Sequence, residues 1–301
     1  MGPARTSVRH GASLAPRPGL PADPGYRAAI ELVLLALLAF VTAGAGALGG
    51  LGGAVLLVPL LVLTGMDPLE AAPLGLLSVA AGSLAAGAVQ LAEGTVHHRL
   101  GITLEIAASF GAVGGALLAG VTPAGVVVRV LAVSAIVAAL AGGLRRGVRN
   151  TADATFAGDV AGEWPGTLSG TYHLGGGVVP YQARRPALGA AAMSVTGMVA
   201  GLSGVSGGFL KTPAMTEIMH VPSKVAASTT LFTVGITSAA ALSVYAGQGR
   251  IDARTGAAVV TGALLGGRVG ALLQSVLPPP VVRRALSVTL ILVGIVLLVR
   301  G

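Results

Sequence analysis

The feature that most constrains this chain is a set of long segments without charged residues. The segment 32–66 alone runs for 35 residues without an Asp, Glu, Lys or Arg. A membrane-spanning helix needs about 20 apolar residues, so this segment is too long for one ordinary span. Glycines near its middle and Pro59 would interrupt a helix. The segment therefore predicts one helix followed by a second, shorter or broken one.

Further apolar segments bring the total to roughly eight to ten membrane segments, broken helices included. They cover residues 71–92, 106–128, 130–144, 186–210, 215–221, 225–249, 255–276 (which Arg268 interrupts) and 285–299. Only 10% of the residues are charged and 53% are hydrophobic, whereas a soluble domain carries roughly 25% charge. The 47 glycines favour close helix packing. The sequence therefore predicts an all-α, polytopic integral membrane protein.

Charge and cysteine content narrow the function classes. A net charge of +8 would suggest nucleic-acid binding in a soluble protein. Here the basic residues lie in the tail and loops, where retention on the cytoplasmic side explains them, so no nucleic-acid partner is expected. The absence of cysteine excludes disulfides, thiolate catalysis and cysteine metal sites. His97 and His98 are adjacent and do not share a helix face, so we expect neither a metal site nor a cofactor.

The two halves of the chain repeat each other. GALGGLGG at Gly46–Gly53 and GLSGVSGG at Gly201–Gly208 share the pattern G-x-x-G-x-x-G-G, and the spacing between repeated motifs stays at 154 or 155 residues. A proline follows each motif, at Pro59 and at Pro213. We therefore expect two homologous half-repeats. The predicted divisions are a disordered basic tail (1–27), a first membrane half (28–144), a polar connecting loop with a β-hairpin (145–186) and a second membrane half (187–301).

The number of crossings decides the orientation and stays open at this point. Four crossings per half would place every basic cluster on one side, as the positive-inside rule asks. Five would make the halves inverted repeats, as in many transporters, and would move the connecting loop to the other side. Either even total puts both termini on the same side of the cell (plasma or inner) membrane, and we expect that side to be cytoplasmic.

The first glycine cluster raises a specific alternative. Gly44-x-Gly46-x-x-Gly49 has the spacing of a dinucleotide-binding loop. Such a loop must follow a short strand, but an apolar run of helical length precedes this one, and the second copy loses the G-x-G. We therefore expect no nucleotide. Small residues three and four apart favour helix packing, whereas glycines followed by a proline in both halves favour discontinuous helices that form a substrate site.

The second cluster opens the most specific part of the sequence. GGFLKTPAMTEIMHVPSKVAASTTLFTVGITSAAALSVYAGQGRID (207–252) resembles the second half of the TauE/SafE family of sulfite exporter-like membrane proteins. VHHRLGITLEIAASFGAVGGALLAG (96–120) resembles the end of that family's first half, and LSGTYHLGGGVVPYQ (168–182) is similar to the connecting loop of one branch. The resemblance implies a secondary transporter, a permease or exporter, of small sulfur-containing anions such as sulfite, sulfonates or thiosulfate.

We expect the anion site where the two broken helices meet. Backbone N–H groups and hydroxyls would bind the oxygens of the anion, and Lys211 would offset its charge. Arg268 would bind it bidentately. The candidate substrate-binding residues are Gly49, Gly52, Gly53, Pro59, Ser203, Gly204, Ser206, Gly207, Gly208, Lys211, Thr212, Pro213 and Arg268.

The charged candidates have structural alternatives. Lys211 could snorkel to the interface from the end of a segment. Arg268 could pair with a carboxylate such as Glu105, or lie at a helix end. Glu105 could carry a coupling proton, face the interface or cap a helix. No segment resembles an ATP-binding domain, so transport would be coupled to a proton or another ion, or to the substrate's own gradient.

Two other function classes remain as alternatives. One is an anion channel on the same pore. The other is an intramembrane serine hydrolase that uses Ser203 or Ser206, because Gly204-x-Ser206-x-Gly208 has the pattern of a hydrolase elbow. A hydrolase needs a histidine base, and none of the five histidines lies centrally in a predicted span. We therefore expect no enzyme. The expected partners are a small anion and the lipid bilayer, and the oligomeric state is not predicted.

Overall fold

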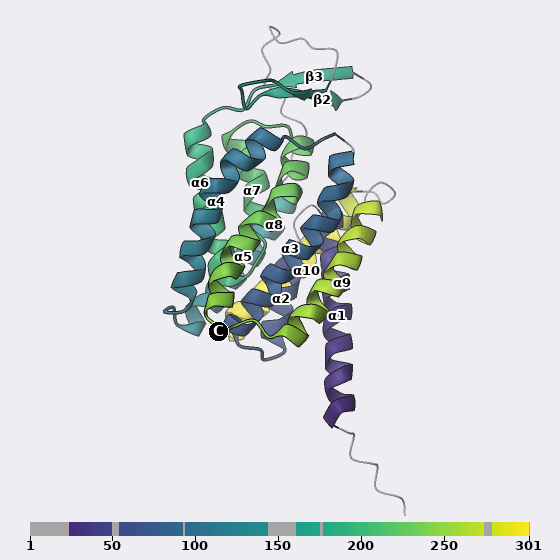
Figure 1. Cartoon of the computed structure of the whole chain (residues 1–301), viewed down its shortest axis with the longest axis vertical. Helices are drawn as coiled ribbons and strands as arrows, with labels where there is room; N and C mark the ends of the chain where they lie inside the picture. The colour runs from purple at the N-terminus through teal and green to yellow at the C-terminus, as the bar shows by residue number, and fades with distance from the viewer. Residues whose placement is uncertain are drawn as a thin grey trace, which may run out of the picture.

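A computed structural model describes residues 24–49, 54–92, 94–143, 161–174, 177–273 and 279–300. Within these residues the chain forms ten α-helices, one π-helical segment and three short strands (Figure 1). In order, they are α1 (Pro24–Gly49), α2 (Ala54–Leu63), α3 (Pro68–Ala92), α4 (His98–Ala119), α5 (Ala124–Gly143), β1 (Gly162–Glu163), β2 (Gly170–Leu174), β3 (Gly177–Tyr181), α6 (Pro186–Ser203), α7 (Gly208–Pro213), η1 (Ala214–Ile218), α8 (Ser223–Gly247), α9 (Ala253–Leu273) and α10 (Pro279–Arg300).

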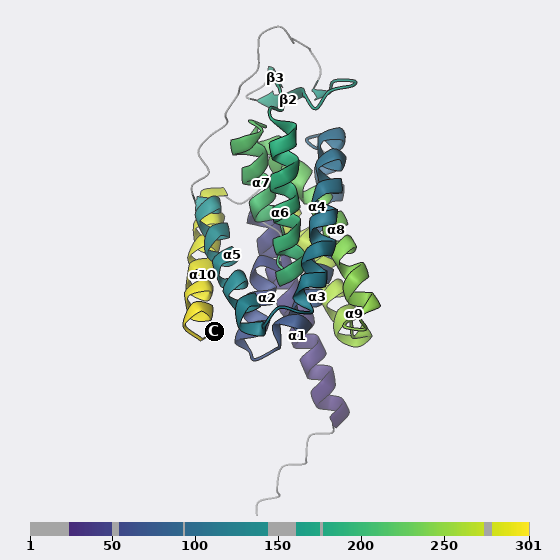
Figure 2. The same cartoon turned by 90° about the vertical axis from the view of Figure 1, so that its left-hand side faces the viewer.

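The helices lie side by side along the long axis, and the strands lie across one end (Figures 1 and 2). Among the described residues, α1, α3, α4, α6, α8 and α9 are long and apolar enough to cross a membrane, and α2, α5 and α10 contain shorter apolar stretches. Large apolar side chains are exposed on the outside of the bundle, including Leu84 (72%) and Phe110 (74%). Water would disfavour such a surface, whereas lipid suits it. The predicted all-α polytopic membrane fold is confirmed.

The long uncharged segment 32–66 forms two helices, as predicted. The first, α1, ends at Gly49, and the second, α2, begins at Ala54. Pro59 lies buried inside α2 and does not mark the interruption. Pro59 lacks an N–H and therefore removes one hydrogen bond inside α2, but the helix continues to Leu63. Gly52 and Gly53 lie outside the described residues.

Successive helices alternate in direction. The α3–α4 connection lies at the end that carries the sheet, because His97 contacts the Ser169 carbonyl. The η1–α8 connection lies there too, where the Arg184 N–H donates to the Met219 carbonyl. The start of α1 and the end of α10 both lie toward the opposite end, with α1 projecting farther (Figure 1). Among the described residues, the bundle therefore contains five helical segments before the sheet and five after it, with α7 and η1 counted as one, and corresponding helices run in opposite directions.

The order of the helices follows the spacing of the predicted duplication. The starts of α2, α3, α4 and α5 precede those of α7, α8, α9 and α10 by 154, 155, 155 and 155 residues. The packing pairs correspond as well, because α1 packs on α9 as α6 packs on α4. These regularities are compatible with an inverted repeat, and the duplication itself stays a prediction.

Glycines allow the closest helix contacts. Between α4 and α6, a Cβ added at Gly111 would overlap the carbonyl oxygen of Ser194, and one at Gly197 would overlap that of Ala108. The same occurs between α1 and α9, where a Cβ at Gly266 would overlap the Phe40 carbonyl. In both pairs the backbones touch without intervening side chains, which is the packing that small residues permit in membranes.

The connecting segment contributes a three-stranded antiparallel sheet in the order β1-β2-β3. The β2–β3 pair is a hairpin in which Gly170 faces Tyr181 and Leu174 faces Gly177. Tyr172 and Tyr181 are buried in a cluster with Met219. The hairpin predicted within 145–186 thus covers the end of the bundle where η1 meets α8.

Glu163 and His97 hold the sheet on the N-terminus of α4. The Glu163 carboxylate accepts hydrogen bonds from the backbone N–H groups of His98 and Arg99 and from the His98 ring. Burial alone would raise the pKa of Glu163, but these hydrogen bonds and the nearby His97 together lower it. Burial lowers the pKa of His97, whose Nδ1 accepts from the Leu100 N–H and whose Nε2 donates to the Ser169 carbonyl.

Candidate functional site

The second predicted break is present, and its sequence explains its shape. Helix α6 ends at Ser203, and Gly204 follows with a φ of +71° in the left-handed region. A Cβ at Gly204 would also overlap the backbone of Ala72, so glycine is required for two reasons. Gly207 precedes the first residue of α7, Gly208. Residues 203–208 are all buried, so the chain turns inside the protein and not at its surface.

The hydroxyls at this break make local hydrogen bonds. Ser203 Oγ donates to the Val199 carbonyl at 2.7 Å, and Ser206 Oγ accepts from the Gly208 N–H at 3.2 Å. Thr212 Oγ1 donates to the Gly208 carbonyl at 3.1 Å and lies 3.3 Å from Thr230 Oγ1. Pro213 ends α7 and is followed by the π-helical segment η1, a feature that often marks functional sites.

Lys211 lies one turn into α7 and is fully buried, with 0% of its surface exposed. Its Nζ donates to Glu105 Oε2 of α4 at 2.6 Å and also to Thr237 Oγ1 of α8. Thr237 in turn donates to the other carboxylate oxygen of Glu105. The three side chains, which we call the Lys211 cluster, form a closed ring that joins three helices. Full burial argues against the alternative that Lys211 snorkels to the interface.

Glu105 is a residue of the candidate site whose place the sequence did not reveal. It is 4% exposed and lies about two turns inside α4, so it neither caps the helix nor faces the interface. A buried charge in an apolar segment needs a partner. That rule could have paired Lys211 with Glu105, because they are charges of opposite sign in segments that the apolar pattern places in the membrane.

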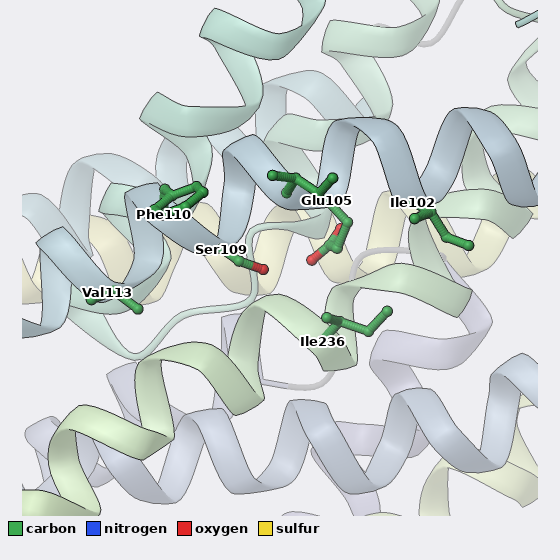
Figure 3. A pocket seen from close by; sticks show the side chains of 7 residues that line it. Ile102, Glu105, Ser109, Phe110, Val113 and Ile236 are labelled. Carbon is green, nitrogen blue, oxygen red and sulfur yellow. The ribbon is translucent and has the colours of Figure 1, made fainter.

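A pocket of about 340 Å³ opens beside the Lys211 cluster, between α4 and α8. Figure 3 shows the Glu105 carboxyl and the Ser109 hydroxyl directed toward the α8 segment that carries Ile236. Apolar side chains make up the rest of the lining, which comprises Ile102, Ile106, Phe110, Val113 and Ile236. Phe110 and Ile106 are 74% and 58% exposed, so the pocket opens toward lipid. Glu105 is therefore close to the lipid-facing surface without being exposed on it.

The structure does not bring all of the predicted site residues together. Ser203, Gly204, Ser206, Gly207, Gly208, Lys211, Thr212 and Pro213 lie along one continuous segment. Arg268 lies instead on the exposed face of α9, a helix that packs mainly on α1 and α3. The partner suggested for Arg268, Glu105, is bound to Lys211. Gly49 ends α1, in the half that does not contain Lys211.

The hydroxyls of Ser203 and Ser206 are bonded to the backbone of their own turn, so neither shows the serine–histidine hydrogen bond of a hydrolase. Across the ranges that the structure covers, no group of three or more histidine, aspartate and glutamate side chains is placed to hold a metal ion. The buried polar groups of this region are an ammonium, a carboxylate and several hydroxyls.

A bundle of apolar helices, with interrupted helices and an ion pair buried beside one interruption, has the characteristics of multi-pass membrane transport proteins. The sequence profile of the sulfite exporter TauE/SafE family matches residues 35–297, so the chain belongs to this family. The family confirms the resemblance and agrees with the expectation that the chain is not an enzyme.

One curated relative adds detail. The chain is 31% identical over 121 residues to a protein described as probable membrane transporter protein YunE from Bacillus subtilis (strain 168). The matched region covers 40% of this chain and 43% of that protein, less than half of either. No solved structure matches this chain.

Proposed function

We propose that this protein is a secondary transporter of small sulfur-containing anions such as sulfite, sulfonates or thiosulfate. The observation that carries the proposal is Lys211, a fully buried cation beside a helix break in a chain of a sulfite exporter family. A buried ammonium costs several kcal/mol unless it is paired, and such a residue inside a membrane protein usually marks a substrate or ion pathway.

Lys211 supplies the charge that an anion needs, and its surroundings supply hydrogen bonds. Thr212 on the same helix and Thr230 and Thr237 on α8 place buried hydroxyls in this region. In the state that the structure shows, the Lys211 ammonium donates hydrogen bonds to Glu105 and Thr237. The anion would replace them, and the two oppositely oriented halves would rock to expose the site to either side in turn.

The test is uptake of labelled sulfite, thiosulfate and taurine into proteoliposomes that contain the purified protein. We expect saturable flux of at least one of these anions, with the others competing. Accumulation against the anion's own gradient would distinguish a carrier from a channel. If none of the three anions moves faster than in protein-free vesicles, the proposed substrate class is wrong.

Two lysine variants locate the site. Lys211→Arg keeps a buried cation but changes its geometry, and we expect it to raise KM more than it lowers the maximal rate. Lys224→Met is the matched control, because Lys224 is exposed in the first turn of α8. We expect Lys224→Met to leave the flux unchanged. Equal kinetics for Lys211→Arg and the wild type would place the anion elsewhere.

The orientation is part of the proposal, with both termini on the cytoplasmic side. Because the chain lacks cysteine, single introduced cysteines report sidedness without background. Pro165 lies in the exposed turn between β1 and β2, and Ala253 begins α9 at the opposite end. An impermeant maleimide should label Pro165→Cys in intact cells and Ala253→Cys only after permeabilisation. The reverse pattern would invert the orientation.

A further inference from the structure

The ammonium of Lys211 is already neutralised from within the protein. Glu105 Oε2 lies 2.6 Å from Nζ, and both side chains are at most 5% exposed. Thr237 bonds to each of them, so the pair is fixed in place. An anionic substrate that needs Lys211 therefore meets a carboxylate in the position that it would occupy.

The charge balance decides what must happen to Glu105. If Glu105 stayed ionised while an anion bound, two negative charges would share one buried ammonium, and like charges in a low dielectric repel strongly. If Glu105 takes up a proton, the carboxyl becomes neutral and the ammonium becomes available. Proton binding at Glu105 and anion binding at Lys211 then favour each other.

We propose, on the basis of the transport function above, that Glu105 is the proton-binding site of this transporter and an internal substitute for its substrate. A proton on Glu105 releases Lys211 to the anion, and when the anion leaves, Glu105 loses its proton and returns to Lys211. The anion and the proton therefore cross together in the same direction.

Among the described residues, the elements packed around the Lys211 cluster carry few other titratable side chains. Helix α6, which packs closely on α4, has no titratable side chain between Pro186 and Ser203. The other elements that pack against α4 and α7 carry Arg129 on α5, Glu217 on η1, and Lys224 and Tyr245 on α8, while α4 itself adds His98 and Arg99 at its start. Within the described ranges, Glu105 and Lys211 form an ion pair only with each other.

Three threonines of α8 lie between the Lys211 cluster and the end of the bundle that carries the sheet. Thr229, Thr233 and Thr237 recur every four residues and therefore share one face of α8. A Cβ at Gly101 of α4 would meet the methyl groups of Thr233 and Thr229, so this face lies against α4. Thr229 accepts a hydrogen bond from the backbone N–H of His97, beside the sheet. The stripe marks the side from which a proton would approach Glu105.

The first experiment uses a hydrophobic carbodiimide, which reaches carboxyls from lipid and reacts with their protonated form. The carboxyl adds across the carbodiimide, and the adduct rearranges to a stable N-acylurea without loss of any group. We expect mass spectrometry to find the label on Glu105 in the wild type, more at acid than at neutral pH, and to find none at this position in Glu105→Gln. An unlabelled Glu105 at every pH, in protein that still labels elsewhere, would contradict a protonatable carboxyl at the pocket between α4 and α8.

The second experiment measures transport in proteoliposomes with the membrane potential clamped at zero. Thiosulfate and simple sulfonates stay fully ionised across neutral pH, so any effect of pH reports the protein. For one proton per anion, a pH gradient of one unit should drive about tenfold accumulation in the wild type. Glu105→Gln should retain exchange of labelled for unlabelled anion but lose this accumulation, because its side chain cannot carry the proton.

The outcomes separate this inference from the proposed function. Flux in the wild type that ignores the pH gradient keeps the transporter and overturns the role of Glu105. No flux in the wild type overturns the transporter, and carbodiimide labelling still decides whether Glu105 binds a proton. If Glu105→Gln elutes as aggregated protein, the wild-type gradient dependence and the labelling decide the matter without it.

Discussion

Removing the charge of Lys211 should destabilise the protein strongly, because its partner is buried with it. In Lys211→Met the Glu105 carboxylate loses the ammonium that lies 2.6 Å away. With an effective dielectric constant of about 20, that attraction is about 6 kcal/mol before the cost of desolvation is subtracted. Breaking one side of a buried ion pair costs about 3–5 kcal/mol in measured cases, so we expect that loss in the free energy of unfolding.

The double variant Lys211→Met/Glu105→Gln makes the prediction specific to the pair. It removes both charges and keeps similar volumes, so its free energy of unfolding should lie within about 1–2 kcal/mol of the wild type. The double variant should therefore be more stable than Lys211→Met alone, which simple loss of packing would not produce. The coupling energy from the cycle should amount to several kcal/mol.

The assay is reversible unfolding in mixed detergent micelles, followed by circular dichroism and intrinsic fluorescence. Lys224→Met serves as the control and should stay within about 0.5 kcal/mol, since Lys224 is exposed. If Lys211→Met were as stable as the wild type, or if the two single changes simply added, the ion pair would not hold α4, α7 and α8 together as the structure indicates.

Two further predictions concern the frame around the Lys211 cluster. Gly111→Ala should separate α4 from α6 and lower the melting temperature, because its Cβ would overlap the Ser194 carbonyl. Gly114→Ala is the control: nothing lies within 4 Å of its Cβ, so this change should be neutral or slightly stabilising. Equal melting temperatures for the two variants would contradict the close contact. The pKa of Glu163 and the pKa of His97 are both lowered from ordinary values of 4.5 and 6.5, so the unfolded chain binds more protons and acid should weaken the docking of the sheet, first below pH 6.5 and again below pH 4.5. Hydrogen exchange of the β2–β3 hairpin at decreasing pH measures this, and Glu163→Gln should remove the lower step; protection that rises on acidification would reverse the sign.

The sequence was informative about the helices because charge is costly inside a membrane. The uncharged length of 32–66 predicted two helices, and α1 and α2 are the result. The glycines at 204–208 predicted a break between α6 and α7, and Gly204 with its positive φ provides it. These predictions depend on local composition and on backbone geometry, which neighbouring residues largely determine.

The pairing of Glu105 with Lys211 does not follow from local composition, and would have required matching opposite charges in distant apolar segments. The two residues are 106 positions apart and meet only after α4, α7 and α8 have assembled. The uncharged run that follows Glu105 made this residue look like the start of a segment, although α4 begins at His98. Arg268 shows the converse difficulty, because an apolar run does not tell which face of a helix is buried. The sequence identifies the charges, and the packing decides which of them is at the site.

The charges of the Lys211 cluster are not repeated at the corresponding positions of the two halves, and this asymmetry has a consequence for stoichiometry. At the spacing of 154 or 155 residues, Lys211, Glu105 and Thr237 correspond to Leu57, Val260 and Gly82. None of these three carries a charge, and Leu57 is fully buried in apolar surroundings. A transporter with two equivalent sites would repeat the cation, whereas this chain has one buried ammonium and one buried carboxylate between the described helices.

If Glu105 and Lys211 act as proposed, each cycle moves one proton with one anion. Simultaneous recording of external pH and labelled thiosulfate should give a flux ratio of about one, fixed by the paired charges. A ratio near two would require a second proton-binding group and would contradict a mechanism based on this single pair.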